Sequence, residues 1–148
     1  MNTVAGCPLC DGPGGRLVVQ TPRWRVIHAQ EPGFPGFYRL VWQDHVREWS
    51  QLAAGERSSC TEALVTIEEA MLRHLRPDKI NLAALGNAVP HLHWHVVARF
   101  DWDSHFPAPV WAAPAREVAP APVTRLRVGL PELDARVARA VAALAPAA

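Results

Sequence analysis

The chain has 148 residues, which suits one domain with room for a hydrophobic core. Its net charge of +1 gives no electrostatic reason to expect nucleic-acid binding. No apolar run approaches the roughly 18 residues that a membrane span requires, and the N-terminus lacks a charged-then-apolar signal pattern. We therefore expect a cytoplasmic protein without a membrane or nucleic-acid partner.

Cys7 and Cys10 form a C-x2-C pair, followed by the turn-rich segment 11–15. In a reducing compartment such a pair is half of a zinc site or a redox pair, and two free thiols are the third alternative. The Gly and Pro residues that follow argue against the helix that a redox pair would open. Because the chain has no second C-x2-C, histidines would have to complete a zinc site. Three cysteines in total do not suggest a disulfide framework.

Three short strands are predicted next, over residues 17–20, 24–29 and 38–42, with a Pro- and Gly-rich loop at 31–36. His45 follows the third strand. From 54 to 75 the apolar period changes to 3.6 residues, which predicts a long amphipathic helix that covers the sheet. Its stripe consists of Cys60, Leu64, Ile67, Met71 and Leu75.

A fourth strand is predicted over residues 79–85, and a tight connection then leads into Pro90–Arg99. In that last stretch His91, His93 and His95 alternate with apolar residues. Successive side chains of a strand point to opposite faces. The pattern therefore predicts a strand with a row of imidazoles on one face, about 6.6 Å apart at about 3.3 Å rise per residue, and an apolar back face.

After Phe100 the chain becomes Pro-rich, which excludes a sheet interior. We expect an extended arm on the surface or on a neighbouring subunit. His105 and Trp111 are within reach of the site from this arm, but solvent positions are favoured for both. Pro131 is predicted to begin a final helix that runs to about Leu144.

The stretch His91-Leu92-His93-Trp94-His95-Val96-Val97 resembles the signature of the histidine triad (HIT) family, His-φ-His-φ-His-φ-φ with φ hydrophobic. The resemblance implies an α+β fold, in which an antiparallel sheet of about five strands is covered by one long helix. It implies a HIT domain over residues 1–106, followed by the Pro-rich arm and C-terminal helix over 107–148.

By this resemblance His93 is the nucleophile that attacks the α-phosphate of a nucleotide. His95 would bond the phosphate or bridging oxygen, and His91 would orient the other two rings. The resemblance further implies four substrate contacts, which are Asn81, Asn87, Trp24 and Ile27. Structural packing is the alternative role of Trp24 and Ile27.

Zinc-bearing relatives of the family join an N-terminal C-x2-C to two histidines. Carried over to this chain, the implied ligands are Cys7, Cys10, His45 and His91, and the implied cofactor is a structural Zn²⁺. A homodimer is also expected from the family.

Three functions follow as alternatives. The first is a nucleotide hydrolase or transferase that acts on a dinucleoside polyphosphate or nucleoside phosphoramidate through a nucleotidyl-His93 intermediate. The second is a metal-dependent hydrolase whose three imidazoles hold a catalytic ion. The third is a nucleotide-binding module without turnover. It is suggested by Asn87, which replaces the usual Gln of relatives, and by Ala88, which replaces a frequent Ser or Thr.

Overall fold

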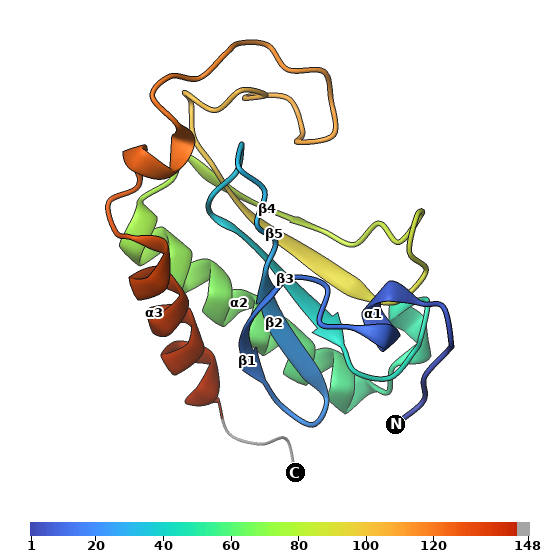
Figure 1. Ribbon diagram of the computed structural model, residues 1–148. Coiled ribbons are helices and arrows are strands. Elements are labelled where there is room, and N and C mark those ends of the chain that lie inside the picture. The colour runs from blue at the N-terminus through green and yellow to red at the C-terminus, as the bar shows by residue number, and fades with distance from the viewer. Residues whose placement is uncertain (145–148) are drawn as a thin grey trace.

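The computed structural model describes residues 1–144 and contains one five-stranded antiparallel sheet (Figure 1). The sheet order is β1-β2-β3-β5-β4, so β5 is paired on both sides and β4 forms an edge. The predicted α+β class is confirmed. The strands are β1 (Arg16–Gln20), β2 (Trp24–His28), β3 (Phe37–Trp42), β4 (Lys79–Ala83) and β5 (His93–Arg99).

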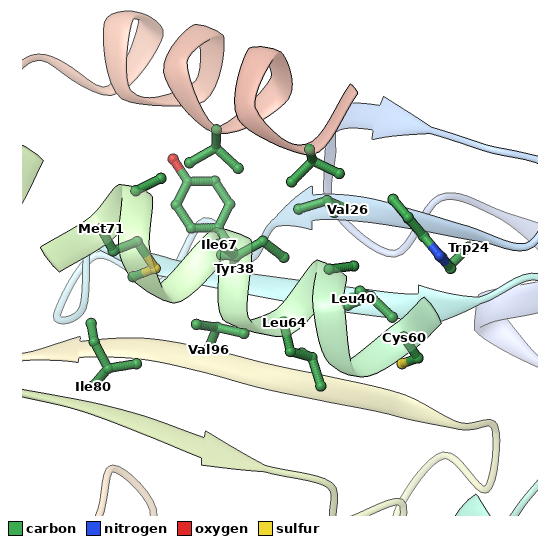
Figure 2. Packing of buried hydrophobic residues seen from close by; sticks show 14 of the residues in the cluster. Trp24, Val26, Tyr38, Leu40, Cys60, Leu64, Ile67, Met71, Ile80 and Val96 are labelled. Carbon is green, nitrogen blue, oxygen red and sulfur yellow. The ribbon is translucent and has the colours of Figure 1, made fainter. Parts of the chain in front are cut away.

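Two helices, α2 (Ala54–Leu75) and α3 (Leu130–Ala142), contribute to the main core on one face of the sheet (Figures 1 and 2). The predicted stripe of α2 is buried in full, including Cys60. Figure 2 shows Cys60, Leu64, Ile67 and Met71 of this stripe against strand residues that include Val26, Leu40 and Val96. The 3.6-residue period therefore identified both the extent of the long helix and its buried face.

Helix α3 is joined to the sheet by a polar contact within this apolar layer. The Tyr38 hydroxyl donates to Asp134 Oδ1 at 2.7 Å, and Arg16 Nε donates to Asp134 Oδ2 at 2.8 Å. Burial is the main reason why the pKa of Tyr38 lies well above its ordinary value. The C-terminal helix thus shares the core of the preceding residues. Positions 145–148 of the predicted 107–148 segment lie outside the described residues.

The opposite face of the sheet carries the histidines. The strand register pairs Val41 with His93, Arg39 with His95 and Asn81 with Val97. Paired residues of neighbouring strands point to the same side, so these side chains share one face. We call it the histidine face.

Three local features differ from the sequence prediction. Pro8–Asp11 forms one helical turn, α1, although Gly and Pro had argued against a helix at the cysteine pair. Proline is compatible with a first helical turn, and Gly12 ends this one. Strand β4 ends at Ala83, although it was predicted to run to residue 85. Strand β5 begins at His93, although the predicted strand included His91. His91 therefore precedes the strand and is free to point elsewhere.

The arm contains a short 3-10 turn, η2 (Pro122–Arg125), and a similar turn, η1 (Trp49–Gln51), precedes α2. Among residues 1–144, the helices are too short or too polar to cross a bilayer.

Candidate active site and metal centre

Strand β5 presents His93 and His95 on the histidine face, as the alternation predicted. Val96 and Ala98 lie in the main core on the other side. The rings of His93 and His95 are edge to face, with their centroids 5.0 Å apart. His91 is fully buried. The structure thus places two of the three rings side by side and turns the first one away.

One hydrogen bond fixes the protonation pattern of His93. Its Nδ1 lies 2.6 Å from the carbonyl oxygen of His91, and only a protonated Nδ1 can donate to that oxygen. Burial lowers the pKa of His93 below its ordinary value, and Arg39 lowers it further, while the bond to the carbonyl opposes both. The ring is therefore neutral at neutral pH, and its Nε2 carries a free lone pair.

His95 is also neutral, and its proton lies on the opposite nitrogen. Burial, with smaller contributions from His93 and Arg39, lowers the pKa of His95 to about 4. Arg39 Nε donates to His95 Nδ1 at 3.5 Å, which leaves the ring proton on Nε2. His93 thus offers a lone pair where its neighbour offers an N–H, an arrangement that combines a nucleophile with a hydrogen-bond donor.

A cavity of about 290 Å³ on the histidine face is lined by His95, whose ring lies against that of His93. His95, Arg39, Asn81 and Glu31 form its polar part, and Glu31 lies 3.8 Å from the Arg39 guanidinium. Its apolar part comes from the sheet, from the loop before β3 and from the arm. The lining consists of Glu31, Phe34, Phe37, Arg39, Asn81, Ala83, Leu85, His95, Val97, Val110 and Trp111.

The remaining predicted substrate contacts lie elsewhere. Trp24 is buried in the main core beneath α2 (Figure 2). Ile27 is on the histidine face but is covered by Cys7 and Leu9 of the N-terminal segment. Asn87 is exposed on the loop between β4 and β5 and does not line the cavity. Of the four implied substrate contacts besides His95, the structure brings only Asn81 into the cavity.

The predicted metal ligands do come together. The ligand atoms of Cys7, Cys10, His45 and His91 all lie within 4.8 Å of one another, from segments that are far apart in sequence. His91 Nε2 donates to the Trp42 carbonyl at 2.7 Å. That bond leaves the lone pair on Nδ1, the atom that faces both thiols.

The sulfur–nitrogen distances fit a tetrahedral ion. His91 Nδ1 lies 3.5 Å from each Sγ, and His45 Nδ1 lies 3.4 Å from Cys10 Sγ. Zn–S bonds of about 2.3 Å and Zn–N bonds of about 2.0–2.1 Å at a tetrahedral angle separate S and N by about 3.5–3.6 Å. The donor set is therefore that of a closed metal site with two thiolates and two imidazoles.

Arg25, which the sequence did not single out, holds the cysteine-bearing segment against the sheet. From β2 its guanidinium donates to the carbonyl oxygens of Leu9, Gly12 and Pro13 at 2.7–3.1 Å. It also donates to Gln43 Oε1 at 2.7 Å. Burial lowers its pKa, while the two thiols oppose that effect. Arg25 is thus a positioning residue for the metal ligands.

We expect Arg25→Met to weaken metal binding by about 10–100-fold, the range found when a residue that orients ligands is removed. The apolar stem keeps the packing, but the carbonyls that hold the segment lose their donor. Competition with a chromophoric chelator measures the affinity. Arg73→Met, an exposed change on α2, is the control. Equal affinities in both variants would show that Arg25 does not position the ligands.

Two cavity residues were not predicted from the sequence, Arg39 and Trp111. Arg39 had a signal, because a charged residue inside an otherwise apolar strand needs a partner or a cavity. Trp111 was expected in solvent but lines the cavity with His95. His105 is not among the lining residues. Its Nδ1 bonds the Ser104 hydroxyl, and its ring packs on Phe34.

Comparisons with known proteins agree with this geometry. The family model of the HIT domain matches residues 14–102. A search of the curated proteins found no match. The chain is similar to a histidine triad protein of Bradyrhizobium japonicum, at 25% identity over 84% of this chain and 89% of that one, with a TM-score of 0.68. A histidine triad protein of Marinobacter aquaeolei shares the fold at 24% identity, 90% and 93% coverage, and a TM-score of 0.69. The chain therefore belongs to the histidine triad family.

Proposed function

We propose that the protein is a nucleotidyl hydrolase or transferase that cleaves at the α-phosphate of a nucleotide derivative through an intermediate on His93. Membership of the family suggests nucleotide binding and hydrolysis in general. The finer proposal depends on one observation, the hydrogen bond that fixes the His93 proton on Nδ1 and leaves Nε2 free for attack. Dinucleoside polyphosphates and nucleoside phosphoramidates are the substrate classes we consider.

In the first step the His93 Nε2 lone pair attacks the α-phosphorus, and a P–N bond forms. The bond from phosphorus to the leaving oxygen or nitrogen breaks, and the leaving group takes that electron pair. The ring becomes cationic while its Nδ1–H keeps the bond to the His91 carbonyl, which stabilises the developing charge. The leaving group takes up a proton from solvent as it departs, and the water that attacks in the second step returns a proton to solvent.

Negative charge on the phosphoryl oxygens needs donors that are already in place. His95 Nε2–H supplies one, because its neutral ring is held in that form by burial and by the bond from Arg39. The Arg39 guanidinium supplies positive charge beside it. In the second step water attacks phosphorus, the P–N bond breaks, and the nucleoside monophosphate is released with His93 restored.

Covalent trapping tests this proposal. After brief incubation with a dinucleoside polyphosphate labelled with ³²P at the α-position, quenching in alkali should leave label on the wild-type chain. The label should be lost in acid, as expected of a P–N bond. His93→Asn should carry none, whereas His105→Asn, outside the cavity, should label like the wild type. Label on the His93 variant would exclude the intermediate, and turnover by wild type without any label would do the same.

We also propose that the metal is a structural Zn²⁺ held by Cys7, Cys10, His45 and His91. Four protein ligands leave no open coordination position for a substrate. Within the described residues His93 and His95 do not join this group. The catalytic-metal alternative, in which all three imidazoles hold one ion, therefore has no observation in its favour.

A homodimer remains a proposal as well. Strand β4 has an unpaired edge, and Leu82 on that strand is 42% exposed. An edge strand with an apolar residue is suited to pairing with another chain. Analytical ultracentrifugation of the full chain tests the assembly state.

A further inference from the structure

The arm that follows β5 begins at a buried ion pair. Arg99 and Asp103 are 2% and 1% exposed. The Arg99 guanidinium donates to both carboxylate oxygens at 2.8 and 3.0 Å and to the Ala108 carbonyl at 2.8 Å. Burial alone would raise the pKa of Asp103, but the bonds from Arg99 and from backbone N–H groups hold it below its ordinary value. The start of the arm is thereby fixed to the end of the strand that carries the histidines.

The next residues form a loop whose two ends meet. The Ser104 carbonyl accepts from the N–H groups of Ala115 and Arg116 at 2.7 and 3.2 Å. The Arg116 side chain donates to the Asp103 carbonyl at 2.6 Å. Residues 104–115 therefore have the closed ends of an Ω-loop. This segment projects from the rest of the arm beyond the end of the sheet (Figure 1).

Trp111 lies in a turn of this loop. Ala112 N–H donates to the Pro109 carbonyl at 3.0 Å, which closes the turn around Val110 and Trp111. Trp111 is 61% exposed, yet it lines the cavity together with Val110 and with Leu85, itself 49% exposed. Two exposed apolar side chains and the half-buried Val110 form one wall of the cavity, and a ligand that covers this wall removes apolar surface from water. We call Leu85, Val110 and Trp111 the apolar wall.

The rest of the cavity limits what can cover this wall. Arg39 and His95 form a donor-rich floor that suits an anionic group. Glu31 also lines the cavity, but its carboxylate is 52% exposed and lies 3.8 Å from Arg39, so the guanidinium keeps donors for a ligand. The ligand must therefore carry an anion on one part and a flat apolar surface on another, within a cavity of about 290 Å³. A nucleotide has this combination, since its phosphate fits the floor and the π-face of its base fits a tryptophan.

Resting on the proposed function, we propose that Trp111 is a specificity residue that stacks on the base of the nucleotide whose phosphate meets His93 and His95. The loop supplies this residue in a preformed position, because the Arg99–Asp103 pair and the closed ends hold it before any ligand arrives. The arm lies beyond the residues matched by the family model. It thereby makes the site selective for nucleotides over phosphate esters that lack a base.

Equilibrium binding of adenosine monophosphate and of ribose 5-phosphate tests the proposal. Wild type should bind the nucleotide more tightly than the sugar phosphate. Trp111→Ala should weaken nucleotide binding by about 5- to 150-fold, the loss expected for one base–aromatic stack, and should change sugar-phosphate binding less than twofold. Trp111→Phe should retain most of the nucleotide affinity. Val123→Ala, an exposed change elsewhere in the arm, should bind both like the wild type.

Three results from Trp111→Ala would overturn the proposal. They are unchanged nucleotide affinity in Trp111→Ala, an equal loss for both ligands, or a loss that accompanies a change in sedimentation and so assigns Trp111 to a subunit interface. A wild-type chain with no preference for the nucleotide would overturn it too. The proposed function has a separate test, the covalent labelling of His93. A failure of that labelling would overturn the proposed function without changing the result of this binding experiment.

Discussion

His93→Ala is expected to lower kcat by about a thousandfold or more, since the loss of a catalytic nucleophile commonly costs on the order of 10³–10⁶. The variant should keep the wild-type melting temperature to within a few degrees, because the ring is only half buried and faces away from the main core. Initial rates with a dinucleoside polyphosphate, together with circular dichroism melts, measure the two quantities.

Two controls separate chemistry from folding. His74→Ala, on the last turn of α2 away from the cavity, should leave turnover unchanged. His93→Gly supplied with free imidazole should recover part of the rate, because a small nucleophile then fills the space of the missing ring. Full activity in His93→Ala would end the proposal of a nucleotidyl-histidine enzyme.

Loss of the metal is expected to cost several kcal/mol of the free energy of unfolding. Structural zinc sites in small peptides bind with apparent free energies of about 10–16 kcal/mol, and a domain has only about 5–15 kcal/mol in total. Cys7 and His91 are buried. Cys7 also belongs to a small apolar cluster on the histidine face, with Leu9, Ile27 and Val41. Cys7→Ser should therefore lower both bound metal and melting temperature. Atomic absorption and thermal melts of the purified chain are the measurements.

Cys60→Ala is the matched control, because that thiol is buried in the main core and does not belong to the ligand group. Its metal content should equal that of the wild type. In the wild type a chelator should act slowly, and turnover should disappear in step with the folded signal. Rapid loss of turnover with an unchanged melting curve would instead indicate a catalytic ion.

The sequence predicted those features that repeat along the chain. A period of two over His91–Phe100 and a period of 3.6 over α2 follow directly from backbone geometry, and they located the histidine face and the covering helix. The metal ligands come from four separate positions with no common period, so only the resemblance to zinc-bearing relatives brought them together.

Features that depend on a single tertiary partner escaped prediction. Arg25 and Arg39 lie in strands, where nothing in the sequence reveals which carbonyls or rings they contact. Trp111 reaches the cavity on an arm whose start is held by the Arg99–Asp103 pair, and no repeating pattern in the sequence encodes that pair. The base contacts implied for Trp24 and Ile27 were wrong for the same reason, because the sequence does not show that Trp24 enters the main core or that Cys7 and Leu9 cover Ile27.

His91 serves two parts of the protein at once. Its Nδ1 faces the thiols, and its carbonyl oxygen accepts a hydrogen bond from His93 Nδ1–H. A backbone shift of a fraction of an ångström at this residue would therefore alter the aim of the attacking nitrogen as well as the geometry of the ion. Exchange or removal of the metal should therefore also change the reactivity of His93, since one residue, His91, is both a ligand of the metal site and the hydrogen-bond partner of the nucleophile.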